Sequence, residues 1–229
     1  MTILTAHSFR NIALLFLCLS AGIVDVIGYL SLGHVFTANM TGNIVLLGMA
    51  AGSSLQLTAF HSFTALSGFV FGVILATIIG GKHKKAFWPK AVTRIFIMEV
   101  LVLLVFALMT LLINIKGSYL MYIILLSMAM GMQTTAARKL DVAGISTTVL
   151  TNTLAHLFED LAQRLSNREH RRAPVEKVNW LRLGSILFYC LGAAVTAFID
   201  EVDPFLIIWL PICALVIMII TATFKYASQ

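Results

Sequence analysis

The stretch AGIVDVIGYLSLGHVFTANMTGNIVLLGMAAG, from Ala21 to Gly52, decides the fold of this chain. It places an acidic residue, Asp25, and a Thr/Asn cluster inside a run that is otherwise apolar enough for a lipid bilayer. Polar groups at that depth need partners within the protein or a wet cavity. The stretch therefore indicates a membrane protein with an interrupted segment.

A weaker copy of this stretch lies in the second half, where Gly131 to Leu161 begins GMQTTAARKLDVAGISTTVLTNTL. Two spaced pairs recur at offsets of 109 and 110 residues, namely Gly22-x-x-Asp25 with Gly131-x-x-Thr134, and Thr37-x-x-x-Thr41 with Thr147-x-x-x-Thr151. Because these offsets are close to half the chain length, the sequence predicts two repeats.

Composition independently indicates a polytopic membrane protein. Hydrophobic residues make up 59% of the chain, charged residues 11%, and the mean hydropathy is +0.95. The 229 residues are almost used up by six to eight spans of about 20 residues, which predicts a single membrane domain over residues 1–229. The net charge of +6 fits basic cytoplasmic loops, and we expect no nucleic-acid partner.

Eight apolar segments follow one another along the chain. They are 11–30, 36–50, 60–80, 95–115, 119–137, 142–157, 183–199 and 205–224. Two of them, 36–50 and 142–157, are short: a helix of 15 residues rises about 22 Å, less than the roughly 30 Å of hydrocarbon.

Charge placement decides how many segments cross the membrane. If all eight crossed, one of the basic loops, 81–94 or 163–182, would lie outside, against the positive-inside rule. If the two short segments enter and leave on one face, both basic loops and both termini lie inside. The acidic turn 200–203 then lies outside, and of the 16 Lys and Arg residues only Lys116 does.

The predicted fold is therefore all-α and integral to the membrane, with six transmembrane helices and two short re-entrant half-helices. Each half, residues 11–115 and 119–225, has three crossings, so the second half is inverted relative to the first. Inverted repeats with interrupted segments are a recurring plan of secondary transporters and channels.

Polar residues beside the two short segments are the predicted site. We expect them to cap the half-helices or to bind a solute where two positive helix ends converge near the midplane. They are Thr37, Asn39, Thr41, Asn43, Gln133, Thr134, Thr147, Thr148 and Thr151. An alternative remains open, in which these groups satisfy only their own backbone.

Asp25 is the most specific candidate for a functional residue, because a carboxylate deep in a span is energetically costly unless it is paired, protonated or hydrated. A proton-coupling or cation-binding role fits it, as does a bond to a neighbouring helix. Arg138 is a charge partner for Asp25 or for a solute, or else an anchor at the inner face. Glu99, five residues after Arg94, is placed to reach that face.

The motifs resemble the YoaK family of small bacterial membrane proteins. The resemblance rests on Gly22-x-x-Asp25, Gly28-Tyr29-Leu30, Gly33-x-x-Phe36, Met40-Thr41-Gly42-Asn43, Gly131-Met132-Gln133 and Thr147-Thr148-Val149-Leu150-Thr151. The second half departs from the family pattern at Gln133-Thr134 and Thr151-Asn152. The resemblance implies six spans and a bacterial inner membrane, but no substrate.

We expect a secondary transporter or channel for a small polar or anionic solute, with Asp25 coupling or gating. The alternative is a non-transporting scaffold or regulatory partner that uses the basic loop 163–182. No Ser/His pair, metal motif or paired aspartates share a predicted face, so we expect no enzyme, cofactor or metal. Partners are the solute and the lipid bilayer, and the sequence leaves a homodimer open.

Overall fold

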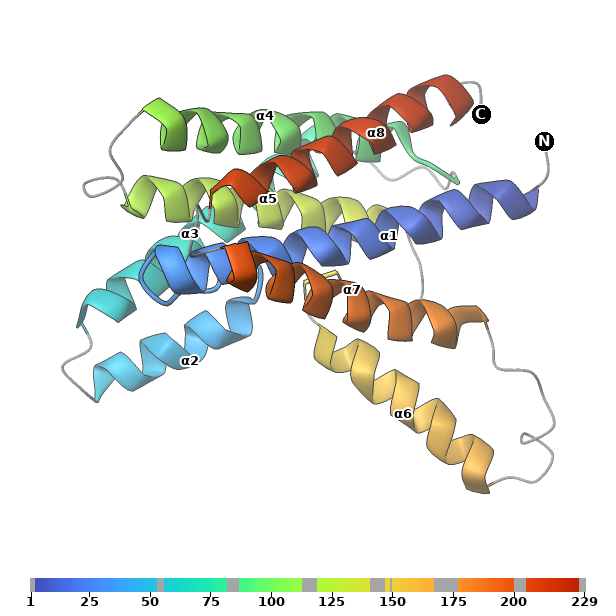
Figure 1. The fold of residues 1–229 in the computed structure, drawn as a ribbon, viewed down its shortest axis with the longest axis horizontal. Helices are drawn as coiled ribbons and strands as arrows, with labels where there is room; N and C mark the ends of the chain where they lie inside the picture. Colours follow the sequence, from blue (N-terminus) through green and yellow to red (C-terminus); the bar gives the residue numbers. More distant parts are fainter. Residues whose placement is uncertain are drawn as a thin grey trace.

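Helices form every regular element that the structure, a computed structural model, describes (Figure 1). The described residues are 3–52, 56–81, 87–112, 119–140, 147–148, 150–166, 177–199 and 205–226. The elements are α1 (Ile3–Val26), the π-helix η1 (Ile27–Ser31), α2 (Met40–Ala51), α3 (Gln56–Gly80), α4 (Lys90–Leu112), α5 (Tyr119–Lys139), α6 (Leu150–Ser166), α7 (Lys177–Ile199), the 3₁₀ turn η4 (Leu206–Ile208) and α8 (Trp209–Tyr226).

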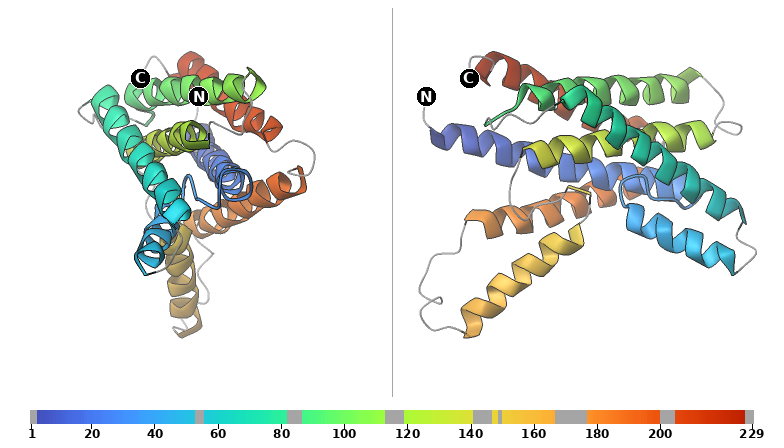
Figure 2. Two further views of the ribbon diagram at one scale, coloured as in Figure 1. Left: turned by 90° about the vertical axis from the view of Figure 1, so that its left-hand side faces the viewer. Right: turned by 180° about the vertical axis from the view of Figure 1, so that it is seen from behind.

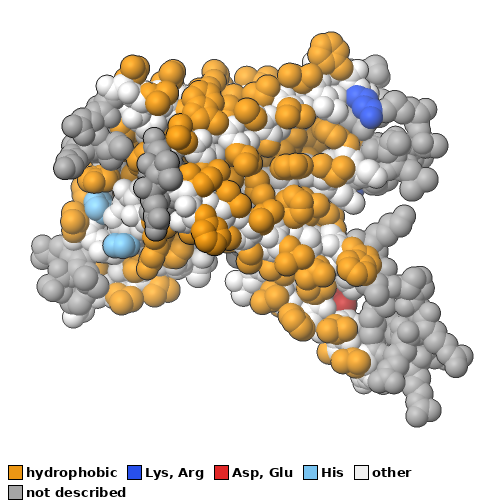
Figure 3. Space-filling view, in the orientation of Figure 1, with side chains coloured by type: hydrophobic (Ala, Val, Ile, Leu, Met, Phe, Trp, Pro, Cys, Tyr) orange, Lys and Arg blue, Asp and Glu red, His pale blue; other side chains and the backbone are white. Residues whose placement is uncertain are grey.

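Six of the described helices are long and apolar enough to cross a bilayer: α1 with η1, α3, α4, α5, α7, and α8 with η4. They correspond to the six long segments predicted from sequence, which confirms an all-α membrane protein. On the face shown in Figure 3, the described side chains at the surface are mostly hydrophobic and few of them are charged. Residues 82–86 and 167–176 of the predicted basic loops and the acidic turn 200–203 lie outside the described residues.

Glycines bring two pairs of helices into close parallel contact. Gly22 of α1 faces the backbone of Tyr189 in α7, and Gly192 of α7 faces the backbone of Leu19. In the other pair, Gly131 of α5 faces the backbone of Phe69 in α3, and Gly72 of α3 faces the backbone of Met128. No Cβ would fit at these four positions, so small residues set the helix separation, as they do in many membrane interfaces.

Helices α1 and α5 run in opposite directions. Gln133 Nε2 in α5 donates to the carbonyl of Leu17 at 3.0 Å, and Arg10 donates to the carbonyl of Leu140 at 3.2 Å. If α2 crossed the bundle like the other helices, strict alternation would make α1 and α5 parallel. The observed antiparallel direction is the one expected when two crossings, those of α3 and α4, separate α1 from α5.

The chain folds back on itself between α1 and α2. Gly33 lies beside His61 near the start of α3. Thr37 contacts Asp25, which precedes it by twelve residues in the sequence. Gly33 and His34 make the turn with φ of 90° and 62°, a left-handed conformation that is uncommon for a residue with a side chain. Helix α2 then leads outward from the middle of the molecule (Figure 1).

Helix α6 differs from the predicted segment 142–157. It begins at Leu150, continues to Ser166 and is amphipathic, while residues 141–146 and 149 lie outside the described part. Its apolar stripe is exposed at Leu154, Phe158, Leu161 and Leu165. Glu159 and Asp160, which follow the predicted segment, belong to the polar face of the same helix.

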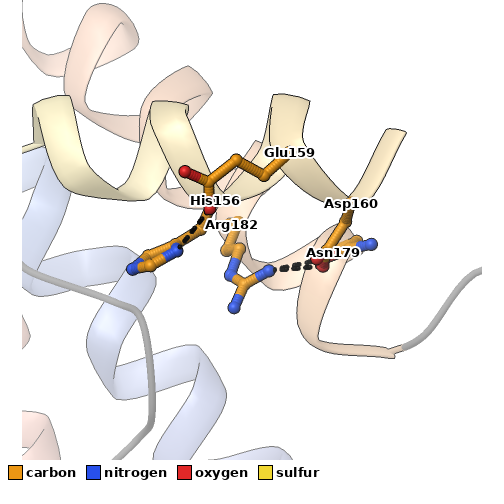
Figure 4. Close-up of polar contacts among 5 residues, drawn as sticks. All are labelled: His156, Glu159, Asp160, Asn179 and Arg182. Carbon is orange, nitrogen blue, oxygen red and sulfur yellow. Dashed lines mark hydrogen bonds and ion pairs between the residues drawn. The ribbon is translucent and has the colours of Figure 1, made fainter. Parts of the chain in front are cut away.

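The far part of α6 diverges from the bundle (Figures 1 and 2), and α6 is tied to α7 by one half-buried cation, Arg182. Arg182 donates to Asp160 at 2.7 Å and to Asn179 at 2.9 Å. His156 and Glu159, 3.3 Å apart, form an exposed pair within α6 (Figure 4). The Arg182 contacts are therefore the polar tether that orients α6, whereas the exposed pair adds little.

Candidate functional site

Asp25 lies at the centre of the fold-back and is 3% exposed. Its Oδ1 accepts hydrogen bonds from the backbone N–H groups of Thr37, Ala38 and Asn39 at 2.8, 2.6 and 3.2 Å. Its Oδ2 accepts a hydrogen bond of 2.5 Å from the hydroxyl of Tyr189 in α7. All four contacts are donors to the carboxylate, so Asp25 joins α1, the loop before α2, and α7.

Two further polar residues shape this loop. The Thr37 hydroxyl donates to the carbonyl of Val24 at 2.8 Å. The Asn43 side chain accepts from the N–H of Phe36 at 3.0 Å and donates to its carbonyl. Because both side chains are buried and engaged with backbone, their role here is to hold the loop in place.

The loop region before α6 has a related arrangement. The Thr134 hydroxyl lies 3.1 Å from the Thr148 hydroxyl and also donates to the carbonyl of Met130. Thr147 is 1% exposed and its hydroxyl has no partner among the described atoms. Thr134 is the counterpart of Asp25 in the predicted repeat, and like Asp25 it bonds to a residue that precedes a shorter helix.

A small polar cavity of about 130 Å³ lies where α2 and α6 begin. Asn39 and Thr41 line it at the start of α2, Thr148 and Thr151 line it at the start of α6, and Leu150 and Tyr189 complete the wall. Asn39 is the N-cap residue of α2, yet its side chain makes no capping hydrogen bond. The first N–H groups of α2 therefore lie next to the cavity without a side-chain cap.

A larger apolar cavity of about 350 Å³ adjoins the first one across Tyr189, which lines both. Among the described residues, Asp25 is the one charged residue in its wall. The other lining residues are Gly22, Val26, Tyr29, Leu30, Phe36, Ala193 and Ala197. Sequence reasoning did not find Tyr189, although a hydroxyl within the apolar run of α7 was a signal for it.

Of the ten predicted site residues other than Arg138, the structure brings four to the polar cavity and places Asp25 at the apolar one. The amide of Gln133 donates to the backbone of α1. Arg138 is exposed at the end of α5, near Leu140, and Leu140 contacts Arg10. Because Asp25 lies fifteen residues, or about 22 Å, further along α1, Arg138 does not serve as its charge partner.

Glu99 is buried within α4, contrary to the expectation that it reaches the inner face. It is 0% exposed, and neither carboxyl oxygen has a partner among the described atoms. In the part of the chain that the structure describes, no three His, Cys, Asp or Glu side chains gather as metal ligands do.

Comparison with known proteins agrees with this picture of a membrane protein. Residues 13–221 match the family model described as "Protein of unknown function (DUF1275)". The chain is 49% identical over 226 residues to the UPF0700 transmembrane protein YoaK of Bacillus subtilis (strain 168), covering 99% of this chain and 100% of that protein. No solved structure matches the chain. The resemblance drawn from the motifs is thereby confirmed.

Proposed function

Because the chain belongs to the DUF1275 family, which is described as of unknown function, we propose its function from the geometry of the site: it is a secondary transporter or channel for a small polar or anionic solute. The observation that carries the proposal is the polar cavity shared by the starts of α2 and α6. These starts are 110 residues apart in the sequence. Each offers hydroxyl groups and the positive end of a helix dipole to a bound solute.

The paired helix contacts support an inverted repeat around this cavity. Leu19 and Gly22 of α1 correspond to Met128 and Gly131 of α5 at the offset of 109 that relates Asp25 to Thr134. Each of these positions contacts a residue of α7 or of α3. The contacted residues of α7 and the corresponding ones of α3 differ in sequence number by a constant 120. Both helix pairs are parallel, while α1 and α5 are antiparallel, as two halves inserted in opposite orientations require.

In this proposal α2 and α6 are the two half-helices, and both basic loops and both termini face the cytoplasm of a bacterial inner membrane. The apolar stripe of α6 lies against lipid near the inner interface. Asp25 gates passage through Tyr189, because its carboxylate holds the hydroxyl of a side chain that borders both cavities.

Solute flux into proteoliposomes tests the proposal. The probes are chloride, nitrate, acetate and urea, and empty liposomes give the background. The double variant Thr41→Val/Thr151→Val removes two hydroxyls from the polar cavity while keeping side-chain volume. At about 1 kcal/mol for each of the two lost hydrogen bonds, we expect about a thirtyfold loss of flux for the transported probe.

The matched control is Thr77→Val/Thr223→Val, since these hydroxyls bond only to carbonyls of their own exposed helix faces. Its flux should equal that of the unmodified protein. Flux that equals the empty-liposome background for all four probes, or that falls equally in both double variants, would contradict a solute site at the polar cavity.

A further inference from the structure

We propose that the apolar cavity beside Asp25 binds a hydrophobic monovalent cation, with the Asp25 carboxylate as its counter-charge. This goes beyond the proposed function, which concerns the polar cavity on the other side of Tyr189. Four features of the described residues carry the inference: an uncompensated charge, saturated hydrogen bonding, an aromatic wall and an open mouth.

The charge of Asp25 has no cationic partner among the described residues. The ion pairs found there join His156 with Glu159 and Arg182 with Asp160, both on or beside α6. Of the charged residues that the structure describes, no other lines the apolar cavity. A buried carboxylate facing an apolar space attracts a cation strongly, because the surroundings screen the interaction poorly.

The hydrogen-bonding capacity of the carboxylate is already used. Three backbone N–H groups and one hydroxyl donate to its two oxygens, which together offer about four lone-pair sites. A primary amine or guanidinium would have to displace these donors. A quaternary ammonium or aryl phosphonium carries charge without N–H groups, so it can approach without breaking any of them.

Aromatic rings form much of the remaining wall. Tyr29 and Phe36 are stacked with their centroids 5.4 Å apart, and Tyr189 lines the same cavity. Aromatic faces attract cations, and quaternary ammonium groups are commonly recognised in this way. The volume of about 350 Å³ falls within the range of about 300–1,000 Å³ that is typical of pockets for organic ligands.

The mouth of the cavity is suited to a ligand that dissolves in the membrane. Tyr29 and Leu30 in its wall are 42% and 45% exposed, near the end of α1. A hydrophobic cation concentrated at the bilayer interface reaches the cavity between α1 and α7 without first entering the polar cavity.

Equilibrium binding to the protein in lipid nanodiscs tests this site, using tetraphenylphosphonium and tetraphenylborate. These ions have the same shape and opposite charge, and empty nanodiscs correct for partitioning into lipid. We expect saturable binding of the phosphonium and none of the borate. Asp25→Asn removes the charge with little change of shape and should weaken phosphonium binding about tenfold or more.

A second variant tests the cavity without touching the carboxylate. Ala193→Leu fills the apolar cavity and should also weaken binding about tenfold, whereas Ala194→Leu, the next residue and not part of the wall, should change it less than twofold. Equal binding of both ions, no phosphonium binding above empty nanodiscs, or unchanged affinity in both Asp25→Asn and Ala193→Leu overturns the proposal. The flux experiment uses other residues and other probes, so either proposal can fail alone.

Discussion

At Asp25 a single charge organises residues from three parts of the chain. Its carboxylate receives the N–H groups of the loop before α2 and the hydroxyl of Tyr189. A charged acceptor makes each of these hydrogen bonds stronger than a neutral one, and in a buried setting each donor would otherwise lack a partner. The fold-back before α2 therefore depends on one residue of α1.

The hydrogen bond from Tyr189 to Asp25 should contribute measurably to stability. Tyr189→Phe keeps the ring and removes only the hydroxyl, and we expect it to lower the free energy of unfolding by about 2 kcal/mol, as is usual for a bond to a charged group. Reversible unfolding in mixed micelles, followed by circular dichroism, measures the change.

Tyr122→Phe is the matched control, because the Tyr122 hydroxyl donates to a neutral carbonyl, that of Met109, at 3.2 Å. It should cost about 1 kcal/mol. If the two variants were equally stable, or if Tyr122→Phe cost more, the hydrogen bond to Asp25 would stabilise the protein no more than a hydrogen bond to a neutral carbonyl does.

Sequence alone could single out Asp25 but not its partners. A carboxylate in an apolar run is visible because it breaks the composition, whereas Tyr189 is 164 residues away in a segment that reads as an ordinary span. The residues of the Thr/Asn cluster also have two different roles, which their spacing in the sequence does not reveal. Thr37 and Asn43 hold backbone, while Asn39 and Thr41 line a cavity, because the fold-back turns them in different directions.

At the scale of elements, the six long helices could be predicted from hydropathy and length, since a bilayer imposes both on any helix that crosses it. Helix α6 could not be placed as well. Its first half is apolar enough to suggest a segment ending at 157, but the one-sided pattern continues to Ser166. Amphipathic periodicity, rather than mean hydropathy, is the signal that finds such a helix.

Because glycines allow close helix packing, substitutions at two glycines far apart in the sequence should lower the stability of the protein equally. Gly22→Ala would press a methyl group into the α7 backbone, and Gly131→Ala would do the same to the α3 backbone. Neither backbone can move without separating a helix pair, so we expect each variant to lose about 1–3 kcal/mol of unfolding free energy. Unfolding in mixed micelles provides the measurement.

Gly48→Ala in α2 is the control, because nothing lies within 4 Å of its added Cβ. It should stabilise the protein by about 0.5–1 kcal/mol through its higher helix propensity. A stable Gly131→Ala alongside an unstable Gly22→Ala would mean that the two helix pairs are not equivalent, and would count against a repeat.

At the scale of the whole molecule, the positions of the ends of α2 and α6 decide whether the halves are inverted. The start of α7 lies beside the first half of α1, where Gly184 faces Leu15, so the end of α6 belongs to the N-terminal end of the bundle. Gly52, after α2, lies at the opposite end, next to the start of α3. Alternation of eight crossings would place both positions on the same side as the N-terminus.

Sided labelling of single cysteines tests this topology in cells. Gly52→Cys and Ser166→Cys are introduced separately into a background whose three native cysteines are alanine, and Ser8→Cys reports the side of the N-terminus. We expect a membrane-impermeant maleimide to reach Gly52→Cys in intact cells, and to reach Ser166→Cys and Ser8→Cys only after permeabilisation. Six crossings and two half-helices require that pattern, because α2 and α6 then return to opposite faces. Protection of all three cysteines in intact cells, with labelling only after permeabilisation, would mean that both shorter helices cross. The two halves would then share one orientation, and the convergence of two helix N-termini on a central solute site would lose its basis.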